Sequence, residues 1–152
     1  LINQKVPTQE LREGVFKSKN PAFDKLIVVD KENGALHSYV YQGEEQIFAP
    51  LLPNFTRPFT DNDSKGWKPH KVLKPWYDHQ PTLTSIATKK VAQDIKVTSV
   101  YEVVKDSADV SVSYHVKPNG VVKVEYHLTA SKDLPNIPKV GMQMGIIYRM
   151  LD

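Results

Sequence analysis

The chain contains no cysteine among its 152 residues. This absence excludes disulfide bonds, thiolate metal sites and a cysteine nucleophile, so burial alone must stabilise the fold. Arginine is also scarce, at positions 12, 57 and 149 only, although the net charge is +3. Proteins that bind nucleic acids favour arginine forks and clustered basic faces. The scattered lysines therefore indicate a solvated surface and no nucleic-acid partner.

Long apolar runs are missing as well. No stretch approaches the roughly 18 apolar residues that would span a membrane, and no secretory signal is visible, so we expect no membrane partner. The composition, 40% hydrophobic and 24% charged, is typical of a soluble globular domain with its own core. Because the chain starts with Leu1 rather than methionine, we expect a processed or excised piece.

Motifs that would supply catalytic or metal chemistry are absent or incomplete. There is no Gly-x-Ser-x-Gly nucleophile elbow and no phosphate-binding glycine loop, and the five histidines lack metal-ligand spacing. Residues 61–66 begin like an EF-hand loop, but Lys65 and Val72 occupy the fifth and twelfth positions, where calcium ligands are needed. Asp61 and Asp63 lie too close together on one turn to flank a glycosidic bond. We therefore expect no catalytic residue and no metal site in this chain.

Most of the chain reads as short β-strands. Residues 1–20 lack an apolar period and are expected to be a linker or a strand of a preceding domain. The remainder, 21–152, predicts one all-β domain, an antiparallel β-sandwich of two packed sheets. Residues 94–106 alternate with a slip after Ser99, which indicates a bulge. The apolar strand expected at 140–150 should be interior or covered, so we expect the domain to be truncated at its C-terminus.

The register of one hairpin follows from its faces. Strands 110–116 and 122–128 place apolar side chains opposite each other only when Val116 pairs with Val122. That register leaves a three-residue loop, Pro118-Asn119-Gly120, with the glycine in the left-handed position. A two-residue loop would shift the register by one residue and reverse every face.

The stretch from 50 to 81 has a different texture, since it holds six of the eleven prolines and both tryptophans. Such proline density predicts a long irregular loop, and long ordered loops are usually functional. Within it, Asn-Phe-Thr-Arg-Pro-Phe-Thr-Asp-Asn-Asp at 54–63 combines Arg57 with the carboxylates Asp61 and Asp63 around Asn62. Proline after the arginine favours an extended backbone. We expect a stiff arm that ends in a turn, with aspartates bonded to nearby backbone.

Two tryptophans in this stretch have two interpretations each. An aromatic ring can stack on a sugar ring or cover a sheet. For Trp76, with Tyr77 beside it, covering the sheet is favoured, whereas for Trp67 the two interpretations stay open. His70 and His79 share the loop, and a solvated surface is the favoured interpretation for them as for the other histidines.

The arm resembles a segment of the lac-type β-galactosidases of glycoside hydrolase family 2. The family motif is similar to residues 54–63, although here the arm lacks an alanine and has Phe59 after the proline. A second motif of the family resembles Leu-Pro-Asn-Ile-Pro-Lys-Val-Gly at 134–141. Order and spacing fit from about residue 23 to residue 144.

The resemblance implies the first half of a galactose-mutarotase-like β-supersandwich, the β-galactosidase small-chain domain. The catalytic glutamates would then lie in an earlier barrel domain, outside this chain. It also implies no cofactor in this segment, with any Mg²⁺ or Na⁺ of the parent enzyme bound elsewhere. The partners would be the remaining domains of the parent β-galactosidase and its galactoside substrate, in the bacterial cytoplasm or periplasm.

The resemblance further implies a site role for one group of residues. Arg57, Asp61, Asn62 and Asp63 would hold a loop that helps shape the sugar site, and Trp67 would belong to that loop. Two other hypotheses remain open. One is a stand-alone carbohydrate-binding module that uses Trp67, Trp76 and Tyr77. The other is a structural spacer that supports assembly.

Overall fold

The chain forms two antiparallel β-sheets in a computed structural model that describes residues 8–12, 15–20, 25–58, 60–66, 68–78 and 80–148. The larger sheet has seven strands in the order β1-β2-β3-β4-β6-β11, with β5 paired to β4. Its strands are β1 (Thr8–Arg12), β2 (Val15–Asn20), β3 (Lys25–Asp30), β4 (Leu36–Tyr41), β5 (Glu44–Glu45), β6 (Ile47–Asn54) and β11 (Gly141–Ile146). The smaller sheet, in the order β10-β9-β8-β7, consists of β7 (Thr82–Val91), β8 (Asp94–Val104), β9 (Ala108–Val116) and β10 (Val122–Ala130).

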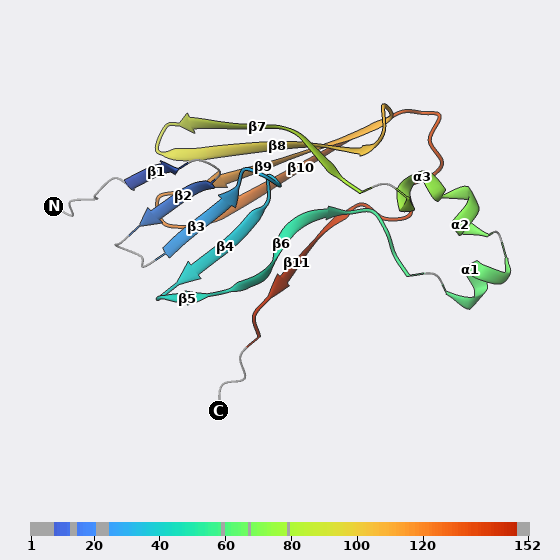
Figure 1. Cartoon of the computed structure of the whole chain (residues 1–152), viewed down its shortest axis with the longest axis horizontal. Helices are drawn as coiled ribbons and strands as arrows, with labels where there is room; N and C mark the ends of the chain where they lie inside the picture. The colour runs from blue at the N-terminus through green and yellow to red at the C-terminus, as the bar shows by residue number, and fades with distance from the viewer. Residues whose placement is uncertain are drawn as a thin grey trace.

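The two sheets lie as layers over one shared core (Figure 1). Alternate side chains of β8 and β9 point inward, and Val97, Val110 and Val112 are fully buried. Facing them from the larger sheet are Ile27 and Val29. This period of two is what places one face of each strand in the core. The predicted all-β sandwich is therefore confirmed.

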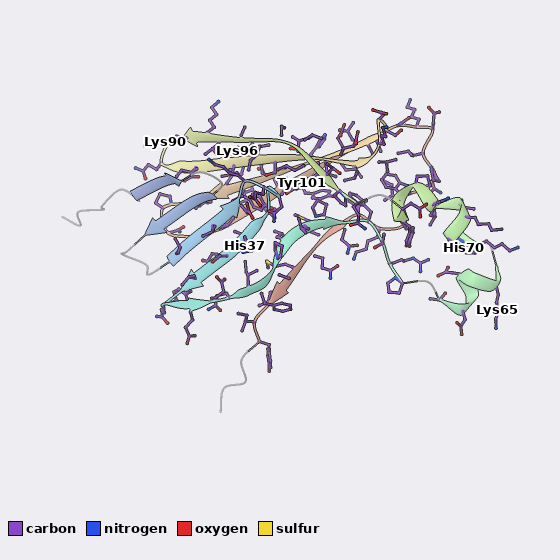
Figure 2. The ribbon with its side chains drawn as sticks, viewed as in Figure 1. His37, Lys65, His70, Lys90, Lys96 and Tyr101 are labelled. Carbon is purple, nitrogen blue, oxygen red and sulfur yellow. The ribbon has the colours of Figure 1, made fainter. Side chains whose placement is uncertain are left out.

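The turn between β3 and β4 joins the two layers by hydrogen bonds. Ser99 Oγ donates to the carbonyl oxygen of Gly34 at 2.7 Å, and the Tyr101 hydroxyl donates to that of Asn33 at 2.8 Å. Tyr101 lies between the sheets (Figure 2). The predicted slip directly after Ser99 is wrong, because Tyr101 and Val103 continue the inward alternation and the register shift against β9 falls between Glu102 and Val104. The buried hydroxyl of Ser99 is tolerated because the Gly34 carbonyl oxygen accepts its hydrogen bond.

The β9–β10 hairpin has the predicted register. Val116 pairs with Val122, and the pairing continues without a shift to Ala108 and Ala130. Gly120 has a φ of +81°, the left-handed conformation expected at the end of the three-residue loop. The sequence prediction of this turn is confirmed.

The sequence left alternatives open for both edges of the larger sheet. Residues 8–12 and 15–20 form strands, and β2 pairs with β3 over its whole length. Whether this segment belongs to a preceding domain, and whether a boundary falls at residue 21, stay predictions. The last strand is β11, which is an edge strand of the sheet in the described residues. Whether a neighbour that would cover it lies outside this chain stays a prediction. Ile146 at the end of β11 and Tyr148 just after it are exposed.

The proline-rich stretch is more regular than predicted. Pro50 and Pro53 lie within β6, which pairs with β4 only at Leu51, so missing backbone N–H groups are tolerated there. Three short helices follow, α1 (Asp61–Lys65), α2 (Pro69–Val72) and α3 (Lys74–Tyr77). They extend from one end of the sandwich (Figure 1). We name residues 55–78 the finger.

No helix in the described residues is long and apolar enough to cross a membrane.

Candidate functional site

The base of the finger is packed into the core through two aromatic rings. Phe55 follows β6 directly, and Trp76 lies in α3; their ring centroids are 5.7 Å apart at a 33° tilt. Both are buried, at 5% and 3% exposure. The indole Nε1 of Trp76 donates to the carbonyl oxygen of Pro135 at 2.9 Å, which ties the finger to the connection before β11. Trp76 therefore covers the core, as predicted.

Arg57 connects the two halves of the finger. Its carbonyl oxygen accepts a 2.9 Å hydrogen bond from the Tyr77 hydroxyl. Its guanidinium group reaches the other way and forms a two-point ion pair with Asp63, with Nη1–Oδ2 at 2.8 Å and Nη2–Oδ1 at 3.2 Å. A two-point arginine–carboxylate pair fixes orientation as well as distance. Arg57 thus links α3 to α1 across the finger.

Asp63 also closes the first turn of α1. Its Oδ2 accepts hydrogen bonds from the backbone N–H of Thr60 and from the Thr60 hydroxyl, both at 2.9 Å. In return the backbone N–H of Asp63 donates to Thr60 Oγ1 at 3.3 Å. This reciprocal pattern is a capping box, the sequence signature of which is Thr-x-x-Asp. The sequence-based interpretation missed Thr60, although that spacing is visible at 60–63.

In the Arg57–Asp63 pair, each charge favours the ionised form of the other residue. Hydrogen bonds from Arg57 and then from the Thr60 backbone hold the pKa of the Asp63 carboxyl far below its usual range. The same ion pair raises the pKa of the Arg57 guanidinium. The side chain of Asp63 is only 12% exposed, against 39% for Arg57. The pair therefore stays ionised at neutral pH and braces the finger, while part of the guanidinium faces solvent.

The other predicted site residues are not joined to this pair. Asp61 is exposed at the first position of α1. Asn62 lies in the same helix, but its side chain is outside the described part of the structure, and so are Trp67 and His79. His70 is exposed in α2. The structure thus brings together Arg57 and Asp63, with Thr60 and Tyr77 as supports that the sequence did not single out.

A second charged cluster lies on the outer face of the smaller sheet. Glu125 Oε1 lies 2.8 Å from Lys123 Nζ. Glu125 Oε2 lies 2.8 Å from His115 Nε2 and 3.8 Å from Lys96 Nζ. These contacts, led by Lys123, lower the pKa of Glu125 to about 2. No group of three or more histidines, aspartates and glutamates in the described residues has the geometry to hold a metal ion.

Replacing Asp63 with asparagine removes one charge of the Arg57–Asp63 ion pair. This should change how the free energy of unfolding depends on pH. Because the Asp63 pKa is lower in the folded chain than in the unfolded chain, the pair stabilises above the unfolded value of about 4. That contribution is lost as the pH falls toward the folded pKa. In Asp63→Asn we expect weaker stability at neutral pH and a smaller further loss below about pH 4. Urea unfolding followed by tryptophan fluorescence between pH 2 and 7 measures this, since both tryptophans lie at 67 and 76.

The matched control for this prediction is Glu125→Gln, which removes another ion-paired carboxylate with a lowered pKa from the smaller sheet. It should keep the acid response that belongs to Asp63. Identical pH profiles for wild type and Asp63→Asn would show that the ion pair does not stabilise the finger.

The chain is similar to known proteins over most of its length. The family model described as "Beta galactosidase small chain" matches residues 23–150, which include the whole finger. The chain belongs to the β-galactosidase small-chain family. It is 34% identical over 119 residues to the β-galactosidase of Priestia megaterium (strain DSM 319 / IMG 1521), across 76% of this chain. It is 28% identical over 137 residues to the β-galactosidase of Streptococcus thermophilus, across 88% of this chain.

This β-galactosidase small-chain segment is a small share of those relatives. It spans 11% of the Priestia megaterium protein and 13% of the Streptococcus thermophilus protein. The resemblance seen in the residues 54–63 and 134–141 is confirmed by both kinds of match. Both relatives are named β-galactosidases.

Proposed function

We propose that this chain is a non-catalytic β-sandwich segment of a retaining β-galactosidase, in which the finger supports and helps shape the sugar site. The parent enzyme would hydrolyse terminal β-galactosides with two glutamates that lie outside this chain. The partners of the segment are then the other domains of that enzyme and, at the finger, the galactoside. The family membership of residues 23–150 supports the first part of this proposal.

The observation that carries the site role is the braced geometry of the finger. Its base is anchored by Phe55 and Trp76, and its two halves are locked by Arg57 and Asp63. The helices nevertheless extend past the end of both sheets (Figure 1). A loop that only connected β6 to β7 would not need a two-point ion pair, a capping box and a tyrosine bridge. A rigid projecting element is what positioning a substrate requires, because small displacements lower catalytic rates strongly.

The stand-alone binding module is the less favoured function. Trp76 is 3% exposed, and the Tyr77 hydroxyl is engaged by the backbone of Arg57. The Trp76 ring therefore lacks the open face that sugar stacking needs, and the Tyr77 ring is partly buried against the core. Calorimetric titration of this chain with galactose and with lactose separates the two functions. We expect no saturable binding, whereas measurable binding would support the module.

Shortening the finger tests the site role directly. In the full-length protein that carries this chain, residues 64–74 are replaced by a short Gly-Ser link. We expect kcat/KM for a nitrophenyl β-galactoside to fall by at least about tenfold, because the substrate loses a positioning element. Asp63→Asn, which keeps the length and removes the ion pair, should give a smaller loss.

The matched control is Glu125→Gln, on the smaller sheet away from the finger, which should leave kcat/KM unchanged. Circular dichroism of each variant checks that the sandwich is folded. Full activity in the folded, shortened variant would favour the structural-spacer hypothesis and would overturn the site role.

A further inference from the structure

Both ends of the finger are tied to one short segment of the chain. At the start of the finger, Asn54 is the last residue of β6 and lies opposite the first residue of β11. Near the end of the finger, the buried indole of Trp76 donates to the carbonyl oxygen of Pro135 at 2.9 Å. We name residues 135–143, which meet the finger at both places, the clamp. Most of the second family motif, 134–141, lies in the clamp, and the proposed function gives that motif no role.

The clamp is a stiff and anchored part of the chain. Pro135 and Pro138 each fix a backbone φ and so limit bending. Leu134 and Ile137 pack against the core on the way from the smaller sheet to the larger one. The connection from β10 passes beside α3 before it enters β11 (Figure 1). The clamp can therefore hold the finger in place and does more than join two strands.

A side-chain hydrogen bond joins the clamp to the start of the finger. Asn54 Nδ2 donates to Gln143 Oε1 at 2.5 Å. Asn54 Oδ1 is already engaged, because it accepts the backbone N–H of Thr56 at 3.0 Å. The amide nitrogen of Asn54 is therefore the atom that faces β11, and Gln143 has to present its oxygen. An acceptor at position 143 is what this geometry requires.

The side chain of Asn54 sets the direction in which the chain leaves β6. It closes an Asx turn onto Thr56, within the first two residues of the finger. Gln143 holds this side chain from the neighbouring strand, where the ladder is still regular, since the register of β11 on β6 shifts only after Gln143. If the Asn54 side chain rotated away, the Thr56 N–H would lose its acceptor and the first turn of the finger would loosen.

We propose that Gln143 is a positioning residue that acts through Asn54, and that the clamp sets the direction in which the finger projects from the sandwich. The inference rests on the proposed function in one respect, since the direction matters to the reaction only if the finger shapes the sugar site. A small change of angle at Asn54 moves the distant helices by a larger distance. Because a displacement of about 1 Å can lower a catalytic rate about 100-fold, Gln143 affects the reaction without touching the galactoside.

The direction of the finger can be measured on this chain with two spin labels. The chain has no cysteine, so nitroxides can be attached at Lys71→Cys in α2 and at Lys90→Cys, at the far end of the sandwich (Figure 2). Double electron–electron resonance gives the distribution of distances between the two labels. Gln143→Met keeps the length of the side chain and removes its oxygen, so it should broaden or shift the distribution. Gln143→Glu keeps an acceptor oxygen and should give the wild-type distribution.

The effect on the reaction is measured in the full-length protein that carries this chain. Gln143→Met should lower kcat/KM for a nitrophenyl β-galactoside about threefold to tenfold, the contribution of one hydrogen bond. The loss should include a higher KM, because a displaced finger holds the sugar less well. A variant that only folded less completely would have a lower kcat and an unchanged KM. Gln143→Glu should restore most of the activity.

The matched control is Gln93→Met, which makes the same substitution at an exposed amide. Gln93 lies in the turn between β7 and β8, at the opposite end of the sandwich from the finger (Figure 1). This variant should change neither the label distances nor KM. The proposal is overturned if wild type and Gln143→Met have the same distance distribution, because the finger is then held without Gln143. It is also overturned if Gln143→Glu behaves like Gln143→Met, because the acceptor oxygen is then not what matters.

The finger-shortening experiment separates this proposal from the proposed function. If the shortened enzyme keeps its activity, the finger does not shape the sugar site, and the label distances alone decide whether the clamp directs it. If shortening lowers activity but Gln143→Met changes neither KM nor the distances, the clamp alone is refuted. Altered distances with an unchanged KM, in an enzyme that shortening inactivates, would refute the positioning role of Gln143.

Discussion

Replacing Trp76 with alanine is expected to lower the free energy of unfolding by about 3–5 kcal/mol. The indole is 3% exposed, packs on Phe55 and donates to the carbonyl oxygen of Pro135. Alanine would leave a cavity where β6, α3 and the connection before β11 meet. Small domains are stable by only about 5–15 kcal/mol, so this loss is large. Urea unfolding followed by circular dichroism measures it, since one fluorescent reporter is removed.

Trp76→Phe is the control for this prediction. It keeps most of the apolar volume and removes the Nε1 hydrogen bond, so we expect a loss of about 1–2 kcal/mol. If alanine costs no more than phenylalanine, the packing of the indole does not hold the finger to the core. Comparable losses in both variants would place the effect in the hydrogen bond instead.

Gly34→Ala is expected to destabilise the fold by about 3 kcal/mol. The glycine has a φ of +68°, and an added Cβ would lie 2.6 Å from Leu83 Cδ1 and 2.7 Å from Ser99 Oγ. The substitution therefore combines backbone strain with a clash in the contact between the two sheets. It would also disturb the hydrogen bond that Ser99 donates to the Gly34 carbonyl.

Gly43→Ala provides a matched control for the clash. Gly43 has a similar φ of +77°, but nothing lies within 4 Å of the position an added Cβ would take. We expect a loss of about 1 kcal/mol, from backbone strain alone. Equal denaturation midpoints for the two alanine variants would show that the sheets adjust to the added methyl group at Gly34.

The strands and their faces could be read from local sequence because a strand has a side-chain period of two. In the hairpin that begins at Val110, one register alone pairs apolar side chains with apolar side chains, and the structure has that register. The same reasoning misplaced the slip that it predicted after Ser99, since inward alternation continues through Tyr101 to Val103 and the register shift against β9 falls between Glu102 and Val104. The burial of the Ser99 hydroxyl depends on the Gly34 carbonyl, 65 residues away in the sequence. The two-residue period of a strand shows which side chains share a face. Whether a buried hydroxyl on that face has a hydrogen-bond acceptor depends on residues far away in the sequence.

The candidate site was only partly readable for a similar reason. Arg57 and Asp63 stood out because an arginine is rare in this chain and carboxylates follow it closely. The capping box at Thr60 was present as a local pattern and was missed. Tyr77 could not have been found this way, because it meets Arg57 only after α1, α2 and α3 reverse the chain. The prolines of β6 misled the prediction, since their tolerance depends on the sparse pairing with β4.

The amino-acid sequence by itself determined the all-β class, the faces of most strands, one hairpin register and membership of the β-galactosidase small-chain family. These follow from local periodicity, turn chemistry and motif order, which do not depend on distant contacts. Only the tertiary structure decided that Trp76 meets Phe55 and the Pro135 carbonyl, that Arg57 bridges Asp63 and Tyr77, and that the finger projects past both sheets. Those features depend on which segments meet in space, and burial and hydrogen bonding between distant residues settle that.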